Sequence, residues 1–418
     1  MPWVPPLDLS PEWRFVLASA RTDIPLHDLQ IGLASQDLDW DRVTEISYRH
    51  GIAPLIYYNL KRREVTGVVP GSGLNKLKES YYGNAARNRL LYRELHKVLG
   101  SLKDVGIEVI VLKGAVLAET VYPNRALRPM NDIDLLVRKE AVSRAEDKLA
   151  ELGYSWRESR RSKEWFKEHH HHLAFVGPEA TPIEVPVEVH WNIHRPSTAF
   201  HIDIYEMWNR AERAKIADVD TLVLSNEDLI LHLCLHACYH KLIGGIRTLC
   251  DITETVRRYA QQIDWGQLQR RSYQWDISEY VYVTLRLAKE LLGAGVPEGV
   301  LDSFEPQAFD SGLIRWAREE ILGDKDASPV FPELAQLWNG RRLKDRVDIA
   351  TRILSPRVVA TYQGISPTSK RIYQYYPARL KHLLFQYGPV LWGLIRRDQQ
   401  LTAAAEGKTR LAEWLNRC

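Results

Sequence analysis

The spacing of apolar residues changes twice along this chain of 418 residues. Up to about residue 105, apolar side chains recur every three or four positions, as on one face of a helix, and the run at 89–102 is the clearest case. Short apolar runs follow, and helical spacing returns beyond about residue 198. The pattern predicts an α+β protein in four parts: an N-terminal helical region at 1–105, a small mixed β-sheet with flanking helices at 106–197, a helical domain at 198–325 and a C-terminal helical region at 326–418.

The short apolar runs read as strands. Residues 107–112 form one buried run, and a second contains Ile133 and Leu135. The runs at 172–176 and 183–189 are separated by a turn-rich segment, so we expect them to pair as a hairpin. Pro186 lacks the N–H that a strand ladder needs, which indicates an edge or a bulge in the last run. Further helices are expected at 140–152, at 229–239 after a capping-box start at 225–228, and at 252–261, 277–293 and 311–322.

Two aspartates lie inside the second apolar run. Asp132 and Asp134 are two positions apart, so both side chains leave the same face of a strand, while Ile133 and Leu135 point to the opposite, packed face. Two carboxylates this close repel each other unless a cation lies between them or one takes a proton. Because hard oxygen ligands suit Mg²⁺, with Mn²⁺ as an alternative, the pattern predicts the metal end of a phosphoryl-transfer site.

A phosphate-binding turn is expected beside this metal site. Lys113, Gly114 and Ala115 follow the first strand and precede a helical run. A glycine here lets the backbone approach a phosphate, and a helix start supplies N–H groups and a positive dipole end. A third carboxylate comes from the last run, where Glu184 and Glu188 share a face.

The histidines allow several interpretations. Four consecutive histidines at 169–172 would point alternately to both faces of a strand, which disfavours a zinc site, although they could line part of the pocket. His190 shares the face of Glu188 and could touch a phosphate, orient Glu188 or bind metal; a hydrogen-bonded core histidine is the competing interpretation. His232, His236 and His240 recur every four residues, a spacing that binds zinc elsewhere, but no nearby acid completes the motif and packing against the sheet is favoured.

Composition excludes several classes. The hydrophobic share of 45% and the charged share of 26% are those of an ordinary globular protein. A net charge of +3 is small for a dedicated nucleic-acid binder. Four cysteines are too few for a disulfide framework, and Cys234 and Cys238 lie one helical turn apart, which favours core packing. Without a leader-like start or a long apolar run, a cytoplasmic protein with no transmembrane segment is expected.

One segment is strongly basic. Residues 341–397 contain twelve Lys or Arg and two acids, Asp345 and Asp348, with aromatic residues interleaved. Such a surface could make peripheral contact with RNA, an acidic peptide or anionic lipid. The favoured alternative is a helical region whose basic faces are solvated or offset an acidic surface elsewhere.

A family resemblance sharpens these expectations. It rests on Leu112-Lys113-Gly114, Tyr122-Pro123, Arg128, the run 132–137 and Glu188-Val189-His190-Trp191. This order resembles the nucleotidyltransferase superfamily of the polymerase-beta type and, more narrowly, the bacterial group called nucleotidyltransferase family 5. The Glu-x-His-Trp context is the reason to prefer Glu188 over Glu184.

The resemblance implies roles for individual residues. Asp132, Asp134 and Glu188 would be the catalytic metal ligands. Nucleotide and phosphate contacts would come from Lys113, Gly114, Ala115, Arg128, His190 and Asp251. Ala115 departs from the serine that binds a terminal phosphate in much of the superfamily, and Lys113 or Arg128 could take over that contact.

The sequence therefore predicts a Mg²⁺-dependent nucleotidyltransferase. It would move a nucleoside monophosphate from a nucleoside triphosphate, with ATP expected from its abundance, to a hydroxyl or phosphate of a small molecule, a peptide or protein, or an RNA. Two alternatives remain. One is a catalytically inactive nucleotide-sensing or partner-binding module on the same fold, which Ala115 favours. The other is a zinc-dependent hydrolase built from the histidine clusters.

Overall fold

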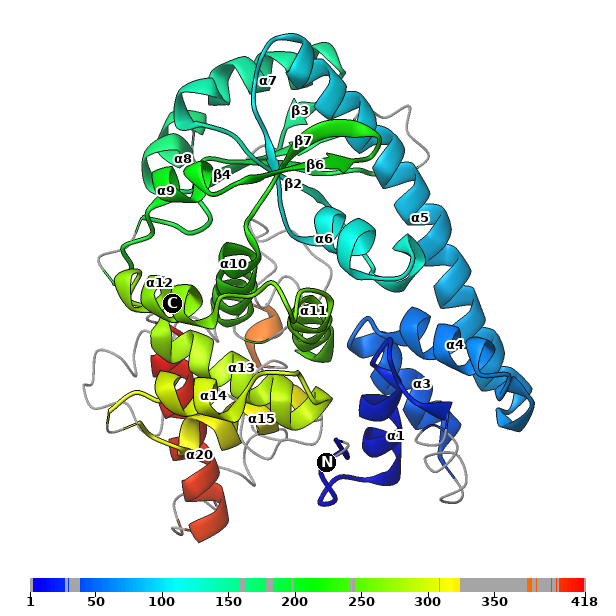
Figure 1. Cartoon of the computed structure of the whole chain (residues 1–418). Helices are drawn as coiled ribbons and strands as arrows, with labels where there is room; N and C mark the ends of the chain where they lie inside the picture. Colours follow the sequence, from blue (N-terminus) through cyan, green and yellow to red (C-terminus); the bar gives the residue numbers. More distant parts are fainter. Residues whose placement is uncertain are drawn as a thin grey trace. The chain divides into compact units, whose positions relative to one another are not determined.

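Figure 1 shows the protein as a computed structural model. It describes residues 3–26, 29, 38–157, 162–177, 183–196, 199–240, 242, 245–307, 309–323, 374–377, 381, 392, 396 and 398–416. Backbone contacts divide the chain into two compact units, Met1–Ala308 and Phe309–Cys418. The finer four-part division remains a prediction.

A seven-stranded mixed sheet lies at the centre of the first unit, in the order β3-β4-β5-β2-β1-β7-β6. Its strands are β1 (Ile110–Val111), β2 (Ile133–Leu136), β3 (Ser155–Trp156), β4 (His172–Val176), β5 (Val187–His190), β6 (Glu212–Ile216) and β7 (Val219–Val223). Strands β2 and β5 are parallel, as are β1 and β7; the other neighbours are antiparallel. The predicted hairpin of β4 and β5 is confirmed.

The expectation of a purely helical chain beyond residue 198 is wrong, because β6 and β7 form a hairpin in the sheet. The turn between them places Ala217 at φ +49° and Asp218 at φ +63°. Tight hairpin turns with two such residues are normally marked by Asn-Gly or Asp-Gly. Ala-Asp carries no such mark, and the mostly polar β6 shows no apolar alternation, so the pattern hid this hairpin.

Helices cover both faces of the sheet (Figure 1). Helices α5 (Gly71–Asp104) and α7 (Val142–Glu151) lie on one face, and their apolar residues form a core with Ile133, Leu135 and Val189. Helices α10 (Asn226–Tyr239) and α11 (Gly245–Arg258) lie on the other side. Ser225 caps α10 by accepting a hydrogen bond from the Asp228 N–H, as predicted. The polar face of β2 and β5 is therefore turned away from the main core.

The remaining helices of the first unit surround this arrangement. They are α1 (Pro11–Ser19), α3 (Trp40–Arg49), α4 (Ala53–Arg62), α6 (Lys113–Val116), α8 (Lys163–His169), α9 (Ile204–Asn209), α12 (Trp265–Gln274), α13 (Ser278–Leu292) and α14 (Glu298–Phe304), with a π-helical turn at Leu117–Val121 and short 3₁₀ turns at Thr66–Val68, Arg125–Leu127 and Lys139–Ala141. Cys234 and Cys238 are buried, which confirms the packing interpretation.

The described part of the second unit consists mainly of α15 (Gly312–Leu322) and α20 (Gln399–Leu415), which contact each other. Gly407 of α20 packs directly against the Trp316 ring of α15. Of the basic segment 341–397, only residues 374–377, 381, 392 and 396 belong to the described residues. Within the described parts of both units, every helix is too short or too polar to cross a membrane.

Candidate active site

Asp134 and Glu188 are direct partners in the parallel pairing of β2 and β5. Because side chains alternate along strands and paired residues point the same way, both carboxylates leave the face opposite the core. Asp132 precedes Asp134 by two positions and shares this face. The structure therefore brings together the three carboxylates that the sequence singled out, on two adjacent strands. Glu184 lies elsewhere: it is exposed and pairs with Arg157 at 2.7 Å.

Lys113 reaches this cluster from the junction between β1 and α6. Its Nζ donates a hydrogen bond to Asp134 Oδ1 at 2.8 Å, and its backbone is left-handed, with φ +46°. Burial opposes ionisation of Asp134, but the Lys113 charge and the His190 hydrogen bond hold the pKa of this carboxylate well below its ordinary value. Asp134 is thus an anion with a fixed cationic partner.

His190 stands between two of the carboxylates. Its Nε2 lies 3.0 Å from Asp134 Oδ1 and 3.3 Å from Glu188 Oε2. Burial would lower the pKa of the imidazole, but contacts with Asp134 and Glu188 raise it above the ordinary value. Burial likewise raises the pKa of Glu188, and the His190 hydrogen bond reverses that shift and leaves it lowered. His190 therefore orients two carboxylates rather than lying apart in the core.

The pKa of the Asp132 carboxylate reflects its buried position close to the other two carboxylates. Burial, followed by the charges of Asp134 and Glu188, raises its pKa to about 6. A carboxylate that resists ionisation because of neighbouring anions is typical of a place where a cation is expected. The donor set of three carboxylates on one face fits a hard divalent cation such as Mg²⁺.

Arg128 and Asp251 form a buried ion pair at the edge of the site. The Arg128 guanidinium donates to Asp251 through Nε and Nη2, with Nη2 at 2.8 Å from Oδ2, and through Nη1 to the Pro129 carbonyl. Tyr122 Oη donates to Asp251 Oδ1 at 2.9 Å. Arg128 thus spends most of its donors within the protein, and Asp251 joins α11 to the segment that follows α6.

Gly114 and Ala115 are tightly packed in the first turn of α6. A Cβ added at Gly114 would lie 2.7 Å from Arg128 Nη1 and 3.0 Å from Met130 Cγ. Ala115 is 2% exposed, lies in the hydrophobic core, and its carbonyl accepts a hydrogen bond from Tyr92 Oη. The Ala115 methyl group therefore faces the core rather than solvent, so any phosphate contact at this position would come from its backbone.

The histidine run is placed differently from the expectation. Only His172 belongs to β4, while His170 and His171 precede the strand. One ring nitrogen from each of His170, His171 and His172 lies within 4.8 Å of the other two, so the argument that alternating faces keep them apart is wrong. His169 ends α8 and stacks on Trp165 instead.

His172 is a site residue that the pattern missed. It pairs with His190 in the register of β4 and β5, and its Nε2 lies 3.8 Å from Glu188 Oε2. This contact depends on the register of the hairpin, which the separation of the two runs in the sequence does not fix. The sequence holds one signal for this contact: in one possible register of the two strands, His172 lies opposite His190.

The second histidine cluster lies on α10. His232 is 2% exposed, as expected for packing, and neither ring nitrogen has a hydrogen-bond partner among the described residues. Burial, with the nearby charge of Lys113, lowers its pKa to about 3. His236 and His240 form a ring contact with centroids 4.3 Å apart. His232 is thus a neutral imidazole at the edge of the charged cluster.

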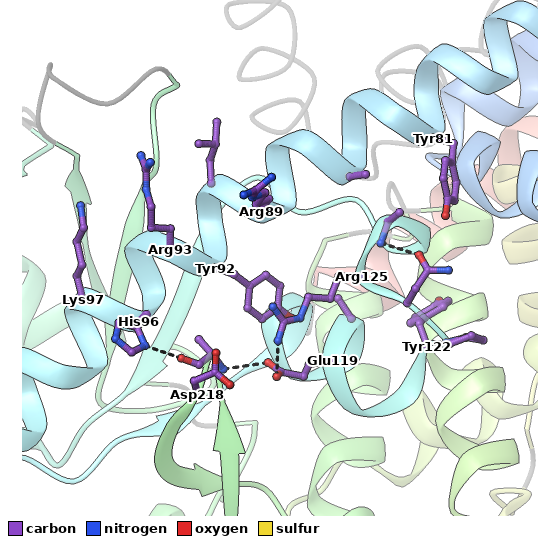
Figure 2. Close-up of a pocket in the computed structure, with 17 residues that line it drawn as sticks. Tyr81, Arg89, Tyr92, Arg93, His96, Lys97, Glu119, Tyr122, Arg125 and Asp218 are labelled. Carbon is purple, nitrogen blue, oxygen red and sulfur yellow. Dashed lines mark hydrogen bonds and ion pairs between the residues drawn. The ribbon is translucent and has the colours of Figure 1, made fainter.

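A separate groove of about 1120 Å³ lies against α5, on the outer side of the turn that follows α6 (Figure 2). Its described lining residues do not include the three carboxylates. Arg89, Arg93 and Lys97 project from α5, and Arg125 pairs with Glu119 beside the Tyr92 ring. Tyr122 lines this groove and also binds Asp251, so it connects the groove wall to the edge of the candidate site.

Residues 36–293 match the model of a protein family described as "Uncharacterised nucleotidyltransferase". The chain belongs to this family. The match includes every residue of the candidate site, confirms the resemblance drawn from the sequence and identifies an enzyme of the nucleotidyltransferase class, which implies a nucleotide substrate. A comparison with curated proteins finds no match.

Proposed function

We propose that this nucleotidyltransferase is Mg²⁺-dependent and transfers a nucleoside monophosphate from a nucleoside triphosphate, with ATP as the expected donor. The acceptor would be a hydroxyl or phosphate of a small molecule, a peptide or protein, or an RNA. The observation that carries the proposal is the grouping of Asp132, Asp134 and Glu188 on one face of two adjacent strands, with Lys113 bound to the central carboxylate.

Asp132, Asp134 and Glu188 would hold the metal, with Mn²⁺ as an alternative to Mg²⁺. Their fit rests on chemistry and charge: three oxygen donors lie together, and burial, followed by the two neighbouring carboxylates, raises the pKa of Asp132 to about 6. When bound, Mg²⁺ supplies charge stabilisation to the triphosphate and orients it. The protein's part of the reaction is then mainly positioning and electrostatics.

The chain's own residues have separate tasks in this proposal. Lys113 offers an ammonium group beside Asp134 that can neutralise phosphate charge, and the backbone N–H groups of Gly114 and Ala115 follow in the same turn. Glu188 would accept the proton of the acceptor hydroxyl, and His190 fixes its orientation through the 3.3 Å contact.

Arg128 and Asp251 would act chiefly as positioning residues. The Arg128 guanidinium lies against Gly114, and Asp251 holds it there. A direct phosphate contact would fall to the N–H groups of Arg128 that Asp251 and Pro129 leave unused. This arrangement fixes the first turn of α6, from which Lys113 extends.

Transfer can be tested with α-labelled nucleoside triphosphates, Mg²⁺ and cell extract, with release of pyrophosphate measured in parallel. We expect label on one class of acceptor and loss of at least about 100-fold of the rate in Asp134→Asn, since a metal ligand contributes several kcal/mol of charge stabilisation. Glu184→Gln is the matched control, because this carboxylate is exposed and pairs only with Arg157 among the described residues.

Two outcomes would overturn the proposal. Equal rates in the wild type and a folded Asp134→Asn variant would remove the carboxylate cluster from catalysis. Mg²⁺-dependent nucleotide binding without pyrophosphate release, for every acceptor fraction tested, would instead support a nucleotide-sensing module. Label placement distinguishes the acceptor classes, because nuclease, protease and size fractionation separate RNA, protein and small molecules.

A further inference from the structure

The candidate site contains a second group of potential metal ligands, and two of its three members are nitrogen donors. His172, Glu188 and His190 each offer one ligand atom, and these three atoms all lie within 4.8 Å of one another. They come from two antiparallel strands, β4 and β5, in which His172 and His190 are direct register partners. Ala174 is the partner of Glu188, so the side chain beside this carboxylate on β4 is only a methyl group.

The spacing of these atoms suits a bound metal ion. Two ligands at about 2.0–2.1 Å from a tetrahedral metal are separated by about 3.3 Å. The Glu188 Oε2 atom lies 3.3 Å from His190 Nε2 and 3.8 Å from His172 Nε2. Both separations from Glu188 are therefore close to the value for a shared ion, and the ligand atoms of His172 and His190 lie within 4.8 Å of each other.

The histidine ring contacts also prepare His172 for this role. Its Nδ1 lies 3.2 Å from His171 Nε2. His171 Nε2 can accept this hydrogen bond in the imidazole tautomer that carries its proton on Nδ1. If His172 Nδ1 donates this hydrogen bond, the lone pair of His172 Nε2 is free to bind a metal ion beside Glu188. A hydrogen bond from the ring nitrogen that does not bind the metal normally orients a metal-binding imidazole.

His190 shows the corresponding imbalance. Its buried Nε2 faces two carboxylate oxygens, of Asp134 and Glu188, although one N–H can serve only one of them well. Its Nδ1 is buried without a hydrogen-bond partner in the described part of the chain. A cation among these atoms would satisfy both carboxylates and the imidazole together.

We propose that His172, Glu188 and His190 bind a transition-metal dication, with Zn²⁺ as the best-suited ion. Imidazole donors favour Zn²⁺ over Mg²⁺, and a set of two histidines and one glutamate leaves an open position, as in catalytic zinc sites. The site goes beyond the proposed nucleotidyl transfer but shares Glu188 with it. The open position would take a water molecule or an oxygen atom of the acceptor.

Binding of Zn²⁺ alone tests this without any nucleotide. Protein stripped with a chelator is titrated with Zn²⁺ against a chromophoric competitor, and the visible spectrum of the Co²⁺ form is recorded. We expect one ion per chain with a dissociation constant below about 1 μM. Binding should be at least about 100-fold weaker in His172→Gln, because loss of a residue that only hydrogen-bonds to a metal ligand already weakens affinity by about 10–100-fold.

The same histidine run offers the matched control. His169→Gln removes an imidazole three positions away that stacks on Trp165 and lies outside the ligand set, so its affinity should equal that of the wild type. Circular dichroism of each metal-free variant confirms that the fold is kept. Glu188→Gln should weaken binding as His172→Gln does, which separates this site from one made by His170, His171 and His172 alone.

Failure of this inference differs from failure of the proposed function. Wild-type protein that binds Zn²⁺ no better than His172→Gln would overturn the zinc site while leaving Mg²⁺-dependent transfer untouched. Zinc binding that survives Glu188→Gln but is lost in His170→Gln would also overturn it, because the ion would then lie in the histidine run. Asp132→Asn should abolish transfer and keep Zn²⁺ binding. A wild-type protein that binds Zn²⁺ but transfers no nucleotide would contradict only the transfer proposal.

Discussion

The guanidinium of Arg128 and the carboxylate of Asp251 form an ion pair whose side chains are 13% and 3% exposed, although the two residues are 123 positions apart in the chain. Breaking one partner of such a pair leaves the other charge buried and unpaired, which typically costs about 3–5 kcal/mol. We expect Asp251→Ala to lower the free energy of unfolding of the first unit by about this amount, measured by urea denaturation.

The surface pair of Arg157 and Glu184 provides the comparison. Both side chains are more than half exposed, so Arg157→Ala should change stability by less than about 1 kcal/mol. Similar losses for both substitutions would show that Asp251 contributes no more than an ordinary surface carboxylate.

Substitution of Gly114 should cause a steric clash that substitution of a loosely packed glycine would not. In Gly114→Ala the new methyl group would collide with Arg128 Nη1 at 2.7 Å, so we expect a loss of about 1–3 kcal/mol and a weakened active site. Thermal unfolding and transfer rate together measure this effect.

Gly83→Ala is the opposite case. Gly83 lies within α5 with nothing inside 4 Å of the added carbon, so alanine should stabilise the helix by about 0.5–1 kcal/mol. If Gly114→Ala were as stable and as active as wild type, the close contact with Arg128 would have no role.

The crowding of carboxylates predicts that Asp132→Asn separates stability from activity. Without metal, the uncharged amide removes the cost of burying an anion and the repulsion from Asp134 and Glu188, so the metal-free variant should unfold at a higher temperature and gain about 1–2 kcal/mol. Transfer should be lost. Differential scanning calorimetry in the presence of a chelator provides the measurement, and a destabilised, well-folded variant would contradict the repulsion.

His232 predicts a dependence of stability on pH. Its pKa falls to about 3 in the folded protein through burial and the charges of Lys113 and His190, which the Asp134 carboxylate partly offsets. The unfolded chain binds a proton near pH 6.5 and the folded chain does not, so stability is lost as pH falls from about 6.5 toward 3.

The size of that loss can be isolated by substitution. His232→Leu should reduce the pH slope of the unfolding free energy by up to about 1.4 kcal/mol per pH unit between pH 6 and 4. His96→Leu is a useful reference, because this histidine is exposed on α5. Equal slopes in wild type and His232→Leu would mean that His232 takes up its proton in the folded state.

Local patterns were enough to predict the carboxylate face. The two-residue period of a strand placed Asp132 and Asp134 together, and the turn-rich segment before β5 predicted the hairpin that carries Glu188. The cap at Ser225 and the start of α10 also follow from neighbouring residues. The strand period and the helix cap depend on contacts within a few positions of the chain, and the hairpin joins two runs that are close in sequence. The preference for Glu188 over Glu184 came from the family resemblance.

Features set by tertiary packing were not accessible in this way. The hydrogen bond of Lys113 to Asp134, the ion pair of Arg128 with Asp251 and the alignment of His172 with His190 all join segments whose relative placement no local pattern fixes. The hairpin of β6 and β7 was missed for a different reason, since Ala217 and Asp218 adopt left-handed backbone conformations without the usual glycine.

The parallel pairing of β2 with β5 has a consequence for how the enzyme matures. Between these strands the chain runs through α7, β3, α8 and β4, so the pairing must close a long loop before Glu188 meets Asp134. Non-local pairing of this kind forms late and slowly. A nascent or partly folded chain should therefore lack the proposed metal site, and uptake of the proposed metal would mark the last stage of folding.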